Sequence, residues 1–113
     1  METPELVTQM RKGALGYCVM ALLAGQPRYG LELVQSLSAV NGMLITEGTI
    51  YPLLSRLRRE HLVETEWRES ASGPPRRYYR LTSRGQEALH AFRREWTTFR
   101  TAVDTILSQG GQP

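Results

Sequence analysis

The chain has 113 residues, of which 41% are hydrophobic and 22% charged, and its formal net charge is +3. This length supports one small domain with its own core and leaves no room for a second. The single cysteine, Cys18, excludes an intramolecular disulfide, and residues 1–9 lack the charged and then apolar order of a secretory signal. The longest apolar run, 18–24, is too short to cross a bilayer, so we expect a soluble cytoplasmic protein.

The positive charge is concentrated in one stretch. Residues 54–84 hold eight basic and four acidic side chains, whereas 1–53 carry a net charge of −1 and 85–113 of zero. Such a local basic patch favours a polyanionic partner, although solvated charge runs are common. Thirteen of the 14 basic residues are arginine. Arginine suits bidentate contacts to phosphate and guanine, but a codon bias of the genome explains its excess equally well.

Apolar spacing predicts two helices in the first 40 residues. The first, over 5–24, has one apolar stripe at three- to five-residue steps, made of Leu6, Met10, Leu15, Val19, Leu22 and Leu23. Gly25, Gln26 and Pro27 end it. A second helix over 29–40 carries Leu31, Val34 and Leu37, and Asn41-Gly42 stops it.

A third helix is predicted to begin at Thr46 or Thr49 and to end near Glu60. One face is apolar, with Ile50, Leu53, Leu54 and Leu57. The other face carries Thr49, Tyr51, Pro52, Ser55, Arg56 and Arg59. Because a proline inside a helix loses a hydrogen bond and clashes with the preceding turn, we expect Pro52 in or near the first turn.

Two alternating segments predict a β-hairpin. Residues 63–69 alternate apolar and charged side chains, and 76–81 place Tyr79 and Leu81 on one face and Arg76, Tyr78 and Arg80 on the other. The turn formers of 70–75 lie between the two segments. Ser83 and Gln86 then offer a capping box for a last helix.

The last helix, over 83–109, carries an apolar stripe with heptad spacing. The stripe consists of Leu89, Phe92, Trp96, Phe99, Val103 and Ile106. A helix of this length spans about 40 Å at 1.5 Å per residue, which is more than a domain of this size covers. We therefore expect it to pair with a second copy of the chain, together with Leu6 and Met10. The alternative is that the stripe folds back on the first helix of its own subunit.

The order α-α-α-β-β-α predicts an α+β fold, mainly α, of the winged helix-turn-helix type with a long C-terminal dimerisation helix. We predict a DNA-binding domain over 1–82, a dimerisation helix over 83–109 and a flexible tail over 110–113. In this fold the third helix enters the major groove, where Thr49, Tyr51, Ser55 and the two arginines suit base edges and phosphates. The alternative is an ordinary solvated helix face.

Three motifs carry a family resemblance over roughly residues 11–107. They are Lys12-Gly13 with Leu15 and then Tyr29-Gly30-Leu31-Glu32-Leu33, the segment 47–57 (EGTIYPLLSRL), and the segment 77–85 (RYYRLTSRG). With them the chain resembles the PadR family of bacterial transcriptional regulators, in its compact branch with one C-terminal helix. Two departures stand out: Pro74 follows Gly73 where the family has a basic residue, and His61 stands where the family has glycine.

The resemblance implies a homodimeric repressor that binds a pseudo-palindromic operator in double-stranded DNA, often at its own promoter or that of a neighbouring gene. The positions implied in DNA binding are Lys12, Tyr29, Thr46, Glu47, Gly48, Thr49, Tyr51, Pro52, Ser55, Arg56, Arg59, Arg76, Arg77 and Tyr79. Phe92, Trp96 and Phe99 are candidate contacts for a flat aromatic or cationic effector. The alternative is that these three rings simply pack the interface.

The sequence gives little support for catalysis. His61 and His90 lie on different predicted elements, and neither paired carboxylates nor a phosphate-binding loop stand out. A metal site is not expected, since Cys18, His61 and His90 lack close ligand spacing, and no cofactor is predicted. The apolar neighbours of Cys18 should raise the pKa of its thiol. The remaining alternative is a winged-helix module that binds protein, but Arg56, Arg59, Arg76 and Arg77 favour DNA.

Overall fold

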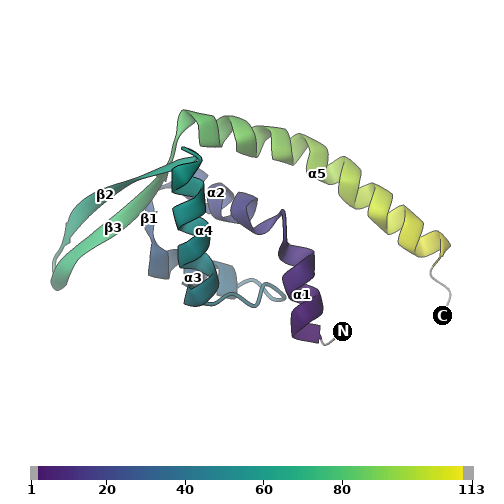
Figure 1. Ribbon diagram of the computed structural model, residues 1–113, viewed down its shortest axis with the longest axis horizontal. Helices are drawn as coiled ribbons and strands as arrows, with labels where there is room; N and C mark the ends of the chain where they lie inside the picture. The colour runs from purple at the N-terminus through teal and green to yellow at the C-terminus, as the bar shows by residue number, and fades with distance from the viewer. Residues whose placement is uncertain (1–2, 111–113) are drawn as a thin grey trace.

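Five helices and three strands follow one another along residues 3–110, the part of the chain that this computed structural model describes (Figure 1). They are α1 (Thr3–Arg11), α2 (Leu15–Gly25), β1 (Arg28–Tyr29), α3 (Gly30–Ser38), α4 (Glu47–Arg59), β2 (Val63–Ser70), β3 (Gly73–Leu81) and α5 (Ser83–Gln109). The predicted class, mainly α with a small antiparallel sheet and a long C-terminal helix, is confirmed. Apart from Gly110, the predicted tail 110–113 lies outside the described residues.

The single helix predicted over 5–24 is wrong, because the chain breaks there into α1 and α2. Gly13 adopts a φ of +84°, which glycine tolerates and which a continuous helix excludes. A turn in which the N–H of Ala14 donates to the carbonyl of Arg11 at 3.0 Å links the two helices. Leu6 and Met10 therefore leave the buried stripe and are 46% and 71% exposed.

Tyr29, predicted as the start of a helix, belongs instead to the two-residue strand β1. This strand pairs antiparallel with β3, Arg28 opposite Tyr79 and Tyr29 opposite Tyr78, so the sheet order is β1-β3-β2. The backbone N–H of Tyr29 donates to the Glu32 carboxylate at 3.1 Å, which supports the start of α3 at Gly30. Along α3 the buried side chains are Leu33 and Leu37, and Leu31 of the predicted stripe is 40% exposed.

Strands β2 and β3 form the predicted hairpin, with a tighter turn than expected. Ser70 faces Gly73 across the ladder, so only residues 71 and 72 remain in the turn, and a register shift lies between Arg68 and Ser70. Pro74 and Pro75 belong to β3. They are tolerated because β1 pairs only at 78 and 79, which leaves the other edge of β3 open to solvent near the tip.

Helix α4 begins at Glu47, so Pro52 lies in its second turn, just after the first turn in or near which it was expected. The proline removes the partner of the Gly48 carbonyl, but that residue is exposed and water can replace the bond. At the other end His61 has a φ of +61°. The N–H groups of His61 and Leu62 donate to the carbonyls of Arg58 and Leu57, which forms a Schellman cap.

Helix α5 is capped by Thr82, and the predicted capping box of Ser83 and Gln86 is wrong. The Thr82 hydroxyl accepts from the N–H of Gly85 at 3.0 Å and also lies 2.7 Å from the His61 carbonyl oxygen, to which it donates. Gly85 leaves no room for a side chain, since a Cβ there would clash with the Leu62 carbonyl and the Leu81 side chain. The start of α5 is thereby fastened to the loop that ends α4.

The core lies between α2, α3, α4 and the base of the hairpin. Its buried apolar side chains are Leu15, Val19, Met20, Leu23, Leu33, Leu37, Ile45, Ile50, Leu54, Leu57, Val63, Tyr79, Leu81 and Leu89. Helix α5 contributes Leu89 to this core and then continues past the other elements, as Figure 1 shows. No helix within residues 3–110 combines the length and the apolar character needed to cross a membrane.

Candidate nucleic-acid interface

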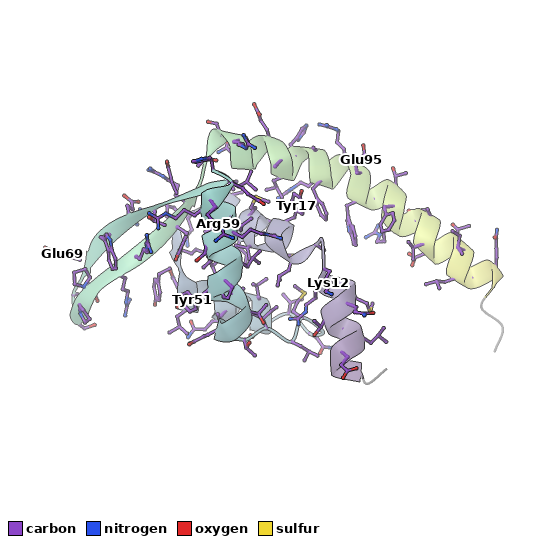
Figure 2. All side chains as sticks on the ribbon, viewed as in Figure 1. Lys12, Tyr17, Tyr51, Arg59, Glu69 and Glu95 are labelled. Carbon is purple, nitrogen blue, oxygen red and sulfur yellow. The ribbon has the colours of Figure 1, made fainter. Side chains whose placement is uncertain are left out.

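Helix α4 presents a polar and basic face to solvent. Ile50, Leu54 and Leu57 are at most 1% exposed, so they fix the orientation of the helix on the core. The predicted contact residues occupy the remaining surface: Thr46, Glu47, Gly48, Tyr51, Pro52, Ser55, Arg56 and Arg59 are exposed and Thr49 is half-buried. Figure 2 labels Tyr51 and Arg59 toward opposite ends of this helix. The structure therefore brings the nine predicted α4 positions together on one accessible surface.

The position of Tyr51 depends on a glycine in the neighbouring helix. A Cβ added at Gly30, the first residue of α3, would lie 2.5 Å from Cε1 of the Tyr51 ring. The ring therefore covers the backbone of α3 at the place where no side chain intervenes. Burial, and then the charge of Glu47, raise the pKa of the Tyr51 phenol above its ordinary value. Tyr51 thus stays a neutral hydroxyl that can donate a hydrogen bond at physiological pH.

A basic groove runs between the α1–α2 junction and α4. It has a volume of about 540 Å³ and is lined by Lys12, Arg11, Arg56 and Arg59 together with Thr49 and Pro52. Its lining within residues 3–110 includes no carboxylate. Arg11 is already engaged, since its guanidinium donates to the carbonyls of Met43 and Leu44 at 3.0 and 2.6 Å. Lys12, Arg56 and Arg59 remain as cations along this groove.

The hairpin carries its arginines on aromatic rings. The Cζ of Arg76 lies 4.5 Å from the centre of the Tyr29 ring, and that of Arg77 lies 5.8 Å from the Trp67 ring. Such stacking holds a guanidinium in place while leaving its N–H groups free in the plane. Tyr29 thereby supports Arg76 directly. Figure 2 labels Glu69 near the projecting end of this hairpin.

Tyr79 differs from the other predicted contacts because it is only 8% exposed and belongs to the core. It lines a small hollow together with Ser55, Arg59 and Arg77 from α4 and β3. The Nε of Arg77 is buried there without a hydrogen-bond partner within the described chain. Tyr79 thus supports this edge of the surface from below, while Ser55 and Arg59 lie above it.

The aromatic side chains of α5 form a stack with α2. Phe92 stacks on Tyr17 with ring centres 4.2 Å apart, and Trp96 follows at 5.6 Å and Phe99 at 6.4 Å. A concavity of about 780 Å³ lies beside them, lined also by Met10 and Ala14 from the α1–α2 junction. Trp96 and Phe99 are 38% and 62% exposed. Tyr17 was not predicted from the sequence, because it lies outside the apolar stripe of its own helix.

The other reactive residues lie apart. Cys18 is half-buried, and burial raises the pKa of its thiol, as expected from its neighbours. No group of three His, Cys, Asp or Glu side chains within residues 3–110 is arranged to hold a metal ion.

Trp67, Arg68 and Tyr78 in the hairpin were not among the predicted site residues. The turn was predicted over 70–75, whereas the shorter turn in the structure places Arg68 opposite Arg76. The strand register is therefore the signal that identifies these hairpin residues.

Comparison with known proteins supports a regulatory role. The model of the transcriptional regulator PadR-like family matches residues 19–91. A PadR-like transcriptional regulator from Bacillus cereus is 37% identical, with a TM-score of 0.79 over 88% of this chain and 96% of that one. A PadR family transcriptional regulator from Eggerthella lenta is 35% identical, with a TM-score of 0.80 over 92% and 90%. A transcriptional regulator of Mycobacterium tuberculosis is 34% identical over 86 residues, which are 76% of this chain and 78% of that protein.

Proposed function

The chain belongs to the transcriptional regulator PadR-like family, and from that premise we propose that it is a homodimeric repressor of its own gene or a neighbouring one. It acts in the cytoplasm on a pseudo-palindromic operator in double-stranded DNA. The observation that carries this proposal is the exposed polar face of α4, which shares a hollow with Arg77 of the hairpin through Ser55 and Arg59. Transcriptional regulation through DNA binding is the property of the family.

In this proposal α4 lies in the major groove. Thr49, Tyr51 and Ser55 supply the short or rigid hydrogen-bonding groups that suit base edges. The start of the helix, Thr46 to Gly48, approaches the groove wall, where Glu47 can accept from a cytosine amino group and Pro52 gives apolar contact. These positions carry sequence specificity.

Phosphate contacts come from both sides of α4. Lys12, Arg56 and Arg59 line the basic groove, Arg77 of the hairpin lies beside Arg59 in a second hollow, and Arg76 stacks on Tyr29 on the opposite face of the hairpin. Each arginine or lysine that neutralises a phosphate releases a condensed counterion, so affinity falls steeply with salt. Tyr29 and Tyr79 contribute by holding Arg76 and by supporting the floor beneath Arg77.

We assign dimerisation to α5 with α1. Phe99 and Ile106 are 62% and 66% exposed, and Val103 is 37% exposed, on one helix that runs beyond its own core. On α1, Leu6 and Met10 add to the apolar surface. An apolar stripe of heptad spacing exposed to water favours a partner helix. Residues 1–82 then form the DNA-binding unit and 83–109 the arm, with Phe92 and Trp96 at the junction.

An aromatic or cationic effector of flat shape fits the concavity beside Phe92, Trp96 and Phe99, and we propose that it releases the repressor. The stacked rings offer π faces to an aromatic or cationic ring, and the charged lining residues Glu95 and Asp104 are balanced by Lys12 and Arg100. Trp96 reports binding if Trp67 is first changed to phenylalanine. Unchanged Trp96 emission across planar cations and phenolic acids would argue that the rings only pack the interface.

The test is a titration of the protein against a fluorescent duplex from its own upstream region and a scrambled duplex at two salt concentrations. A repressor of its own gene binds the upstream duplex tightly and the scrambled duplex weakly, with the weak binding strongly salt-dependent. Equal, weak binding to both moves the operator to another gene. Absence of salt-dependent binding to either duplex favours the second candidate, a winged-helix module that binds protein.

A further inference from the structure

Two arginines face each other on the hairpin with no obvious reason in the free protein. Arg68 of β2 is directly opposite Arg76 of β3 in the antiparallel register. Like charges in this relation destabilise a β ladder. We call Arg68 and Arg76 the wing arginine pair. An anion that lies between the two guanidinium groups relieves this repulsion.

Aromatic rings hold both members of the wing arginine pair on the same face. The Cζ of Arg68 lies 4.5 Å from the centre of the Tyr78 ring, and the Cζ of Arg76 lies at the same distance from the Tyr29 ring. The two tyrosine rings themselves meet edge to face, with centres 5.4 Å apart. The four side chains therefore form one cluster in which both guanidinium groups are held in place. Their N–H edges are left for a planar or tetrahedral acceptor.

The charge around the pair is incompletely balanced. Arg68 donates to the Glu66 carboxylate at 2.7 Å, and the nearby Arg80 donates to Glu64 at 2.6 Å. Within residues 3–110 no carboxylate oxygen lies within 4.0 Å of a nitrogen of Arg76. The pair thus has one carboxylate, on Arg68, for two guanidinium groups, whereas Arg80 and Glu64 form a complete ion pair.

We propose that the wing arginine pair binds one backbone phosphate of the DNA, with Tyr78 and Tyr29 as the residues that position the two guanidinium groups. This assigns Arg68 a direct contact and rests on the proposed function. Glu66 occupies Arg68 in the free protein and competes with the phosphate. The hydrogen bond from Arg68 lowers the pKa of the Glu66 carboxyl, so this competitor is ionised at neutral pH.

The hairpin contains its own matched control. Arg80 lies on the same face, has a side-chain exposure of 50% against 46% for Arg68, and is also paired with one glutamate, across the ladder where Arg68 pairs along its own strand. Arg68→Gln and Arg80→Gln each remove one positive charge from the same strand pair. They differ in that Arg80 faces Glu64 across the ladder, and Arg68 faces a second arginine.

The experiment measures duplex binding by fluorescence anisotropy over a series of salt concentrations, with a thermal melt to check each fold. Arg68→Gln is expected to weaken binding roughly three- to tenfold and to reduce the salt slope by about one, while Arg80→Gln leaves both near the wild-type values. Equal losses in the two variants, or no loss in Arg68→Gln, overturn the proposal. If the wild-type chain shows no salt-dependent binding to duplex, the proposed function itself fails.

The glutamates give an independent test with the opposite sign. Glu66→Gln frees Arg68 and should tighten binding about two- to fivefold, whereas Glu64→Gln makes the same change in net charge beside Arg80 and should have a smaller effect. Tyr78→Phe keeps the ring under Arg68 and should bind as the wild type does, and Tyr78→Leu should lose as much as Arg68→Gln. Equal gains for both glutamate variants would mean that only net charge matters and would overturn the proposal.

Discussion

A single missing side chain determines where Tyr51 lies. Gly30 begins α3, and the ring of Tyr51 occupies the space that a Cβ would fill. The sequence analysis placed Tyr51 on the exposed face of α4, but the need for glycine at 30 follows only from the distance between the two helices. A residue without a side chain thus controls a proposed base contact.

We predict that Gly30→Ala weakens operator binding about tenfold while lowering the free energy of unfolding by less than about 1 kcal/mol. The methyl group displaces the Tyr51 ring, which is 43% exposed and free to move outward. Binding is measured by anisotropy and stability by urea unfolding. Gly25→Ala is the control, because a Cβ at Gly25 meets nothing within 4 Å. Equal affinity of Gly30→Ala and the wild type would show that the ring position is unimportant.

The cap of α4 contains a strained residue. His61 adopts a left-handed conformation with a φ of +61°, in which a side chain costs about 1–2 kcal/mol relative to glycine. We predict that His61→Gly stabilises the chain by about 0.5–1 kcal/mol, since the added freedom of the unfolded glycine offsets part of the gain. The midpoint of thermal unfolding should rise by a few degrees. A lower midpoint would mean that the imidazole makes a compensating contact.

At the scale of elements, the periodicity of apolar residues correctly predicted α3, α4, the hairpin and α5. It did not predict the features that depend on one or two residues, namely the break between α1 and α2, strand β1 and the cap of α5. Gly13 within an apolar pattern fits a helix or a break, and its positive φ settles the matter only in the folded chain. Strand β1 has only two residues, which are too few to show an alternating pattern. It is a strand because it pairs with β3. Ser83 and Thr82 are both good caps, and the carbonyls of His61 and Leu62 favour Thr82.

The correction of the α5 cap can be tested by two alanine substitutions. Thr82→Ala is expected to destabilise the fold by about 1–2 kcal/mol, because it removes the cap to Gly85 and the bond to His61. Ser83→Ala, one residue along, should change stability by less than about 0.5 kcal/mol. Urea unfolding of the two variants measures both. The reverse order would restore Ser83 as the cap.

At the scale of the whole molecule, α5 extends far beyond the core that Leu89 joins. We predict that Phe99→Glu converts a dimer into a folded monomer, because it places a charge on the proposed interface without entering the core. Analytical ultracentrifugation measures the mass and circular dichroism the fold. Thr101→Glu, also exposed on α5, is the control and should leave the dimer intact. A wild-type chain that sediments as a monomer would contradict the assignment.

A two-fold dimer also predicts the shape of the footprint. Two copies of α4 should protect successive major grooves about 34 Å apart, in a pattern symmetric about the dyad. Hydroxyl-radical footprinting at saturating protein measures this directly. Protection of one half-site alone would contradict symmetric binding.

The family was identifiable from the sequence because each of its three motifs is a continuous or nearly continuous segment, near the starts of α2 and α3, in α4, and in β3. The candidate site was predicted less completely. The helical and alternating patterns of the sequence were enough to place Arg56, Arg59 and Arg76 on exposed faces. They could not identify Tyr17, Arg68 and Tyr78, because the roles of these residues depend on contacts with other elements. Tyr79, proposed from its motif, is largely buried. Contacts between side chains of different elements are determined by tertiary packing, so no periodic pattern along the sequence reveals them.

The hydroxyl of Thr82 joins the end of α4 to the beginning of α5, so the two helices share a pivot. A helix of 27 residues acts there as a lever about 40 Å long. A rotation of about 5° at the pivot moves its far end by roughly 3.5 Å, and in the proposed dimer the same rotation turns α4 relative to the dimer axis. In the proposed dimer, any ligand that tilts the arm therefore changes the separation of the two α4 helices, without a change in a single residue of the proposed DNA-binding surface.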